Sequence, residues 1–387
     1  MRALIAFDKF KDSLTAREAC DLTARALRDR HPDWSLDLCP LADGGEGFAE
    51  ILTRATGGKM VRHRVDGPRG TPLDAAFGLV NWEKIPPAAQ HLLQLQTPYS
   101  VLQSSSVAVI EMAAASGLAL LPTDARDPWQ ASTAGTGQLI RAAAEAGAIG
   151  VLLGVGGSAT NDLGFGALNA LGLDFLSADG QAVRPPIPAH WNRITKIDGA
   201  APRSLPPIRI ACDVTNPLLG PQGAAAIYGP QKGLRPEDRK RIEHESARLA
   251  LMLCNHCRQS DSLMDLPGAG AAGGLPFGLM AATGARLLPG FDLVSTWLDL
   301  EAKIAAADVI ITGEGRFDQS SLSGKGPGAV AARGRALGKP VHVFAGAVTA
   351  STQDGLALHA ITPAGTPLPE ALRTAGTNLQ TAVAANC

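Results

Sequence analysis

The sequence lacks a strong net charge. Its 387 residues include 35 basic and 36 acidic side chains, which gives a formal net charge of -1 at pH 7. A chain so close to neutrality has no overall field that would attract nucleic acid or an anionic membrane. We therefore expect small-molecule partners, and neither nucleic acid nor a membrane.

The sequence also lacks a long apolar segment near residue 1. Residues 1–7 are followed directly by the charged Asp8 and Lys9. A secretory signal peptide or a membrane anchor requires a longer apolar core. This pattern indicates a cytoplasmic protein.

Cysteine is scarce, with six residues in the chain. A chain of this length can bury a large core without crosslinks, so we expect thiols rather than a disulfide framework. Cys254 and Cys257 have the spacing of half a zinc site, but no second Cys/His pair with ligand spacing follows. Because residues 241–257 carry apolar side chains among charged ones, we expect both thiols to lie on a helix.

The sequence contains no Walker A motif, although residues 308–328 come near one. They read as a buried strand that ends in glycines and then presents Glu314, Arg316, Asp318 and Lys325. The Gly-Lys pair is followed by glycine instead of Ser/Thr, and the upstream glycine is missing. Ligands of open α/β sheets bind at the carboxyl ends of strands, so an anion site is still indicated. A purely structural role for the glycines remains the alternative.

Apolar runs alternate with alanine-rich stretches along the chain. The runs predict strands at residues 3–7, 107–112, 149–155, 208–212, 309–312 and 341–344. Alanine-rich segments predict helices at residues 15–30, 136–146 and 329–337. Strands separated by helices predict βαβ units, and hence an α/β fold with mostly parallel sheets.

The first and the last predicted strands have the same apolar character. We expect them to share a sheet, so that residues 1–65 plus 290–387 form one discontinuous domain of flavodoxin or Rossmann type. Residues 66–289 then form a second α/β domain inserted into the first. Within it, residues 83–106 are rich in Pro, Gln and Ser, and we interpret them as a surface excursion or a short exposed helix with a flexible tail, without chemistry.

Two turns near the start of the sequence carry candidate ligands. Lys11 and Ser13 follow the first strand, where a helix N-terminus would favour a phosphate or a carboxylate. Simple helix capping is an equally good interpretation of that turn. Asp43 and Glu46 are interleaved with three glycines in the next turn, and such carboxylates could bind magnesium.

The densest group of hydroxyl and amide side chains follows the predicted strand at residues 149–155. It contains Ser158, Thr160 and Asn161 directly after two glycines. A dinucleotide-binding fingerprint is the competing interpretation, but its third glycine is absent. We therefore favour a site for a polar ligand.

Two later segments add candidates. Asp213 follows another predicted strand and could accept a proton or hold a metal ion, while Asn216 could orient a hydroxyl group. Lys232 lies in a tight glycine-flanked turn. The glycine-rich residues 268–274 indicate a close backbone approach to a ligand or to another chain segment.

Taken in order, these segments closely resemble the type I glycerate kinase family over nearly the full length of the chain. The resemblance implies two α/β domains with the active site in the cleft between them. It also implies phosphorylation of D-glycerate by ATP with magnesium, usually to 2-phosphoglycerate. The resemblance is carried by Phe10-Lys11-x-Ser13, Ala42-Asp43-Gly44-Gly45-Glu46-Gly47, Glu111-Met112-Ala113-Ala114-Ala115-Ser116-Gly117, Gly135-Thr136-Gly137, Gly156-Gly157-Ser158-Ala159-Thr160-Asn161-Asp162, Cys212-Asp213-Val214-x-Asn216-Pro217-Leu218, Gly229-Pro230-Gln231-Lys232-Gly233 and Thr312-Gly313-Glu314-Gly315-Arg316.

With this resemblance we predict in-line phosphoryl transfer. Asp213 is the preferred base and Asp318 the second candidate, while Lys11 and Arg316 would neutralise phosphate charge or grip the glycerate carboxylate. Magnesium would bind Asp43 and Glu46. The predicted substrate and phosphate contacts are Ser13, Gly44, Gly45, Ser158, Thr160, Asn161, Asn216, Lys232, Gly313, Glu314 and Lys325.

The sequence departs from the family pattern at several positions. Asp12 stands where the family commonly has glycine, and Leu163 stands where glycine follows Asp162. We expect a monomer or homodimer. Two other functions remain open: a kinase for a related small hydroxy acid, or a non-catalytic sensor of glycerate or nucleotide.

Overall fold

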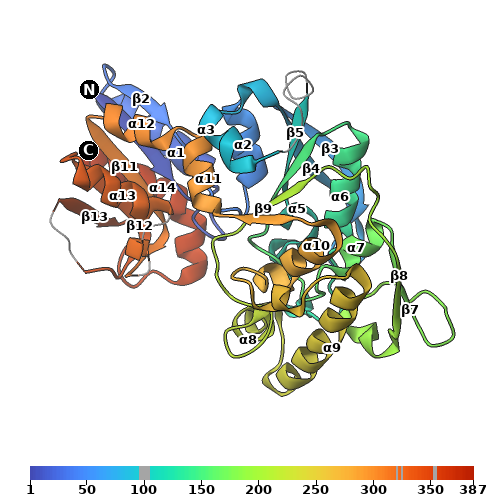
Figure 1. Ribbon diagram of the computed structural model, residues 1–387. Helices are drawn as coiled ribbons and strands as arrows, with labels where there is room; N and C mark the ends of the chain where they lie inside the picture. Colours follow the sequence, from blue (N-terminus) through green and yellow to red (C-terminus); the bar gives the residue numbers. More distant parts are fainter. Residues whose placement is uncertain (96–104, 320, 324–325, 352–354) are drawn as a thin grey trace. The chain divides into compact units, whose positions relative to one another are not determined.

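The computed structural model describes residues 1–387 with the exception of 96–104, 320, 324–325 and 352–354. The chain forms two compact units (Figure 1). The first unit comprises Met1–Asp43 and Val294–Cys387, and the second comprises Gly44–Leu293. In sequence, the second unit is therefore an insertion into the first.

The first unit contains a five-stranded parallel sheet. Its strand order is β13-β12-β11-β1-β2, so the first strand of the chain pairs with β11, as predicted. Both strands are apolar, as expected for central strands of a parallel sheet that is covered on both faces. The strands are β1 (Arg2–Phe7), β2 (Ser35–Leu38), β11 (Val309–Phe317), β12 (Val341–Val348) and β13 (Leu356–Ala360).

Helices cover both faces of this sheet. One face carries Ile5, Ile311 and Phe344, which share a buried cluster with Leu27 and Leu379 from two helices. α13 packs against the opposite face. The helices of this unit are α1 (Ala16–Arg30), α12 (Leu300–Ala306), α13 (Gly326–Ala336) and α14 (Leu368–Asn386).

The second unit contains a six-stranded mixed sheet of order β10-β9-β6-β5-β4-β3 and a two-stranded sheet, β7-β8. Strands β5, β6, β9 and β10 are parallel, whereas β3, β4 and β5 pair antiparallel. The α/β class with mostly parallel sheets is thus confirmed. The strands are β3 (Lys59–Asp66), β4 (Pro72–Asn81), β5 (Ser106–Glu111), β6 (Gly150–Gly154), β7 (Leu173–Leu176), β8 (Lys196–Gly199), β9 (Ile208–Ala211) and β10 (Arg286–Leu288).

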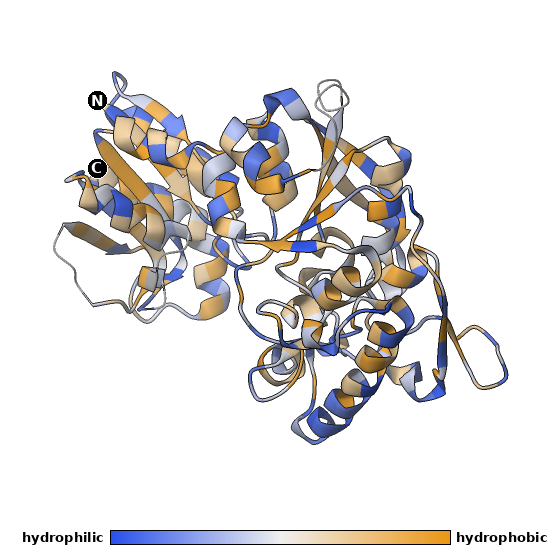
Figure 2. Cartoon of the chain, viewed as in Figure 1, coloured by the Kyte–Doolittle hydropathy of each residue, from blue (hydrophilic) through white to orange (hydrophobic). Residues whose placement is uncertain are grey.

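The helices of the second unit vary widely in length. α9 carries the predicted Cys254 and Cys257, and its alternating colours in Figure 2 reflect one buried and one charged side. α11 crosses the boundary between the units. The helices are α2 (Phe48–Ala55), α3 (Pro87–Leu93), α5 (Ala113–Ser116), α6 (Ala134–Glu145), α7 (Phe165–Ala170), α8 (Ala224–Tyr228), α9 (Arg239–Cys257), α10 (Leu275–Thr283) and α11 (Gly290–Trp297). Within the described residues, none has both the length and the apolar character that crossing a membrane requires.

The unit boundary after Asp43 lies upstream of the domain boundary drawn from the sequence after residue 65. β3 pairs with β4 along its whole length, which brings β3 into the second unit. β3 is a largely exposed edge strand rich in Arg and Lys, as edge strands often are. Its weak apolar pattern explains why the sequence did not indicate a strand there.

Residues 83–95 pack against the rest of the second unit. Ile85, Ala89 and Leu93 are buried, and the Arg209 side chain of β9 donates from Nε to the carbonyl of Leu93 at 2.6 Å. The last carbonyl groups of a helix have no hydrogen-bond donors within the helix, and an arginine at this end can supply them. The first half of the predicted surface excursion is therefore anchored, and residues 96–104 lie outside the described part of the chain.

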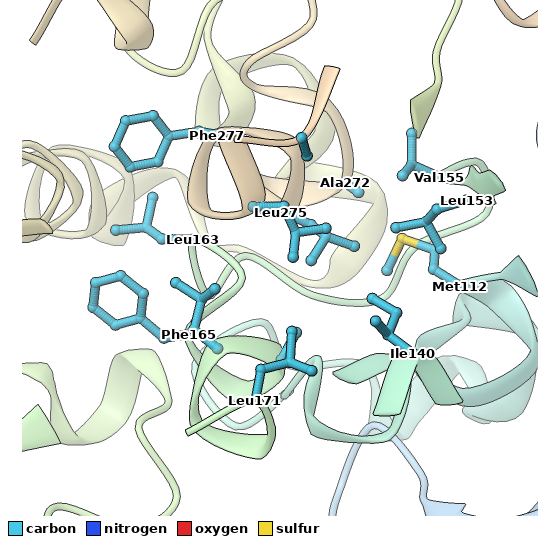
Figure 3. Close-up of a cluster of buried hydrophobic side chains, with 14 of the residues drawn as sticks. Met112, Ile140, Leu153, Val155, Leu163, Phe165, Leu171, Ala272, Leu275 and Phe277 are labelled. Atoms are coloured by element: carbon cyan, nitrogen blue, oxygen red, sulfur yellow. The ribbon is translucent and has the colours of Figure 1, made fainter. Parts of the chain in front are cut away.

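The largest core cluster lies in the second unit. Figure 3 shows Leu163 and Phe165 among side chains from several elements, including Leu275 and Phe277 of α10. Leu163 is 1% exposed although its φ is +56°, a left-handed conformation that favours glycine. Burial of the leucine side chain compensates for the strained backbone here.

Candidate active site

A first polar cluster lies at the carboxyl edge of the five-stranded sheet. The amide of Asp8 donates to the carbonyl of Gly313 at 3.0 Å, and the amide of Leu41 donates to the carbonyl of Phe7 at 2.8 Å. Beyond the end of β1 the chain therefore still pairs with β11, and the segment after β2 still pairs with the end of β1. Three acidic residues interact electrostatically near this edge: Asp8 after β1, Asp43 in the chain after β2, and Glu314 within β11.

The carboxylates in this cluster repel one another. Burial, followed by the negative charge of Asp43, raises the pKa of Asp8 to about 7, although the Lys9 amide donates to Asp8 Oδ1 at 2.7 Å. Burial also raises the pKa of Glu314, and the charges of Asp318 and Asp43 raise it further. Such an edge favours a cation. Asp8 was missed as a candidate, although its place directly after the first strand was a usable signal.

Basic side chains lie beside this acidic edge. A Cβ on Gly315 would lie 3.1 Å from the backbone nitrogen of Lys11, so the glycine lets the turn that carries Lys11 and Ser13 lie against β11. The Lys11 side chain is exposed. The Arg316 Nε atom lies 3.4 Å from Oδ2 of Asp318, with two thirds of the Arg316 side chain accessible. The structure thus places the turn of Lys11 beside the end of β11 that carries Arg316, and pairs Arg316 with Asp318.

The predicted magnesium ligands fall on the two sides of the unit boundary. Asp43 belongs to the first unit and Glu46 to the second, and both are exposed. Within the described ranges, no group of three or more His, Cys, Asp or Glu side chains forms a ready-made metal site. The acidic edge around Asp8 and Glu314 fits magnesium, which commonly takes one or two carboxylates and completes its shell with phosphate and water.

Two further predicted positions lie in the same unit. Gly313 is inside β11, where any Cβ would overlap the carbonyl of Phe344 in the neighbouring strand. Sheet packing therefore explains the glycine. Lys325 lies outside the described residues.

Glycines in the second unit join one turn to the ends of two strands. The amide of Gly156 donates to the carbonyl of Gly44 at 3.0 Å, and a Cβ on Gly156 would lie 2.6 Å from Cα of Gly45. Gly44 has a φ of +97° and lies against Ala211, the last residue of β9. Glu111 Oε2 accepts a hydrogen bond of 3.0 Å from the second residue of α2. Backbone packing therefore holds the turn that presents Glu46.

The loop at residues 156–162, which follows β6, carries three predicted ligands. Ser158, Thr160 and Asn161 are all buried. The Thr160 hydroxyl donates to the carbonyl of Ala272 at 3.4 Å. Among the described residues, Oδ1 of Asn161 is buried without a hydrogen-bond partner, which is costly.

Asp162 organises the end of this loop. Its Oδ2 atom accepts from the amide and the hydroxyl of Thr133, both at 2.8 Å, and from the amide of Gly166 at 3.1 Å. Its Oδ1 atom accepts from the amide of Gly164 at 3.1 Å. Burial raises the pKa of Asp162, and these hydrogen bonds oppose the rise. Asp162 is therefore part of the framework.

Asp213 and Asn216 both have partners within the second unit. Asp213 accepts from the amide of Gly290 at 3.1 Å and from that of Phe291 at 2.7 Å, so it binds the first turn of α11. Asn216 Oδ1 accepts from the hydroxyl of Tyr228 at 2.6 Å. These contacts fix both side chains. The roles of Asp213 as a base and Asn216 as a hydroxyl contact stay predictions.

Lys232 is buried, with only 1% of its surface exposed. Its Nζ atom donates to the carbonyl of Thr160 at 2.6 Å. Burial lowers the pKa of this ammonium group to about 7, although the charge of Asp162 acts in the opposite direction. The side chain is thus directed at the 156–162 loop.

Known proteins resemble this chain over nearly its full length. The family model for the glycerate kinase family matches residues 3–386. The glycerate kinase of Bacillus subtilis (strain 168) is 38% identical over 379 residues, which is 96% of this chain and 93% of the relative. The chain belongs to the glycerate kinase family.

Two other members of the glycerate kinase family support this placement. The glycerate 2-kinase of Escherichia coli (strain K12) is 38% identical over 352 residues, covering 90% of this chain and 86% of the relative. A crystal structure described as glycerate kinase 2 from Salmonella typhimurium LT2 has a TM-score of 0.76 and 38% sequence identity, and the match covers 100% of this chain and 96% of that chain. The predicted family is confirmed, and the chain is an enzyme of this family.

Proposed function

We propose that this enzyme phosphorylates D-glycerate at the 2-hydroxyl group, with ATP as the phosphate donor and magnesium as the metal ion. The observation that carries the proposal is the match to the glycerate kinase family over residues 3–386. A relative of 38% identity is named glycerate 2-kinase, which supports the regiochemistry.

The acidic edge supports the requirement for a metal ion. Asp8, Asp43 and Glu314 place negative charge together, and the pKa of Asp8 is raised first by burial and then by the charge of Asp43. Asp43 and Glu46 remain our proposed ligands, with Asp8 added as a third candidate. When bound, magnesium would neutralise charge on the phosphate oxygens.

The basic side chains would bind the anionic groups of the substrates. Lys11 and Arg316 are exposed beside the acidic edge, where each could contact a phosphate or the glycerate carboxylate. The planar guanidinium of Arg316 can bind two oxygens at once. In the second unit, Ser158, Thr160 and Asn161 would supply donors and acceptors for the hydroxyl groups of the acid.

Asp213 and Asp318 remain the proposed candidates for the proton acceptor. Asp213 is held by two amide donors, which orient its carboxylate. Asp318 Oδ2 lies 3.4 Å from Nε of Arg316. Positioning and electrostatic stabilisation supply most of the rate enhancement in phosphoryl transfer, so a strong base is not required.

Product analysis by NMR tests the proposal directly. The protein is incubated with ATP, magnesium and D-glycerate, and the phosphorus resonance of the product is examined for coupling to protons. Coupling to the single proton at C2 identifies 2-phosphoglycerate, whereas coupling to the C3 methylene protons identifies 3-phosphoglycerate and contradicts the regiochemistry. L-glycerate is the matched control.

A coupled ADP assay with a panel of small hydroxy acids separates the other functions. Faster ADP release with another acid would identify that acid as the preferred substrate instead of D-glycerate. Tight binding of glycerate without ADP release would indicate a sensor. Either result would contradict the proposed function.

A further inference from the structure

Lys232 is an unusual residue to find in a protein interior. Lysine is almost never fully buried unless its ammonium group is paired. Here the side chain is 1% exposed, and Nζ donates to the backbone carbonyl of Thr160 at 2.6 Å. Burying this donor costs free energy that an exposed lysine would not incur. A specific internal role would explain the cost.

The turn that carries Lys232 is itself fixed. The amide of Lys232 donates to the carbonyl of Gly229 at 3.0 Å, which closes the turn. Gly233 has a φ of +91°, and a Cβ there would overlap the carbonyl of Arg126. A Cβ on Gly229 would overlap the carbonyl oxygen of Ala225, so both glycines are needed to set the backbone from which the lysine extends. The side chain reaches Thr160 from a rigid base.

Thr160 lies in the middle of a loop that holds an unfavourable conformation. Asn161 has a buried oxygen without a partner among the described residues, and the following Leu163 has a φ of +56°. Such features persist only where the surroundings over-determine the conformation. The loop would relax if its anchors were weakened.

The anchors of this loop come from several segments. Its start is bound to Gly44, and its end is bound through Asp162 to Thr133. The amide of Leu163 donates to the carbonyl of Gly273 at 3.0 Å. At the centre of the loop, the amide of Ala159 donates to the carbonyl of Ser116 at 2.9 Å, and Lys232 adds a charged anchor at the carbonyl of Thr160.

We propose that Lys232 is a positioning residue, which acts through the Thr160 carbonyl to hold Ser158, Thr160 and Asn161 in the arrangement that binds the hydroxy acid. Its predicted role as a phosphate contact is replaced, because the side chain is buried and directed at the loop. The proposal deepens the proposed function and rests on it for the identity of the acid.

The test replaces Lys232 by methionine, which preserves much of the volume and removes the donor. The KM for D-glycerate should rise about 10- to 100-fold with a smaller change in the KM for ATP, since about 1.4 kcal/mol corresponds to each factor of ten. Amide hydrogen exchange in residues 156–162 should accelerate. Lys196→Met, an exposed change in β8, is the matched control and should alter neither quantity.

Lys232→Gln provides a second variant with a shorter side chain that still carries an N–H donor. It should recover part of the KM and part of the exchange protection. A raised KM for ATP with unchanged loop exchange in Lys232→Met would overturn the proposal and restore a phosphate contact. Wild-type values for both the KM and the exchange would also overturn it.

One measurement requires no variant. In the free wild-type protein, residues 158–162 should exchange as slowly as the adjacent strand β6 if the loop is held before substrate binds. Rapid exchange there would contradict the proposal. The exchange result does not depend on catalysis, so a failure to phosphorylate D-glycerate would refute the proposed function separately.

Discussion

Two regions of this protein hold acidic side chains in opposite ways. At the carboxyl edge of the sheet in the first unit, Asp8 lies near Asp43 and Glu314, and burial and like charge raise its pKa to about 7. In the second unit, Asp162 is fully buried and accepts four hydrogen bonds.

The difference distinguishes a carboxylate that stabilises the fold from carboxylates that could bind a cation. A buried carboxylate with four donors has its hydrogen-bonding capacity used within the fold, and such a network makes the surrounding loops rigid. Carboxylates that raise one another's pKa leave negative charge for an external cation to compensate. We therefore expect substitution of Asp162 to affect stability first, and substitutions at the acidic edge to affect the pH and metal dependence.

Asp162→Ala should have the largest effect. It removes the acceptor of the Thr133, Gly164 and Gly166 donors, and leaving these groups buried without partners should lower the free energy of unfolding by about 3–5 kcal/mol. Urea unfolding followed by circular dichroism measures the change. Asp198→Ala, an exposed change in β8, should cost less than about 0.5 kcal/mol. A loss below about 1 kcal/mol for Asp162→Ala would show that the network is not part of the framework.

Leu163→Gly restores the residue that the family commonly has at this position. Glycine would relieve the left-handed backbone by about 1 kcal/mol, but the loss of a fully buried leucine costs about 2–5 kcal/mol. We expect a net loss of about 1–4 kcal/mol, measured by thermal unfolding. Equal or greater stability of the glycine variant would mean that the core closes around the missing side chain.

Asp8→Asn tests the acidic edge. The folded-state pKa of Asp8, about 7, lies above its ordinary value of 3.8, so the folded protein holds this proton more tightly than the unfolded chain. The contribution of Asp8 to stability is therefore complete below pH 3.8 and is lost as the pH rises to about 7.

At pH 8 the Asp8→Asn variant should be more stable than the wild type by about 1–2 kcal/mol, a figure reduced for contact with water. The two proteins should differ little at pH 3.5. Added magnesium should narrow the gap at pH 8, because the cation would compensate the wild-type carboxylates. A gap that does not depend on pH would refute repulsion at this edge.

Asp12→Gly should have the smallest effect. Asp12 has a φ of +63° and an exposed side chain, so glycine would relieve the backbone without emptying a core. Because glycine also increases the entropy of the unfolded chain, we expect a gain of only about 0–1 kcal/mol. Thermal unfolding of Asp12→Gly beside Leu163→Gly compares the same change at an exposed and at a buried site. A clear loss in Asp12→Gly would show that the aspartate side chain stabilises its turn.

The sequence predicted the elements whose signal is local. Apolar runs identified β1, β5, β6, β9, β11 and β12, and their alternation with helical segments predicted the parallel sheets. The edge strand β3 was not recognised, because exposed charged residues interrupt its apolar pattern. Polar residues after strands could likewise be proposed as ligands, because the carboxyl edge of a parallel sheet is set by chain direction alone.

By itself, the sequence determined the α/β class, the family and the segments that meet at strand ends, since each depends on neighbouring residues or on ordered motifs. Only the tertiary structure decided what individual side chains contact. Lys232 and Thr160 are 72 residues apart, and Asp213 and Phe291 are 78 residues apart. A motif gives the residue type at each position, but it carries no information about which distant backbone group a side chain reaches. That choice is made by packing, which buried Lys232 against the carbonyl of Thr160 and placed Asp8 near Asp43 and Glu314.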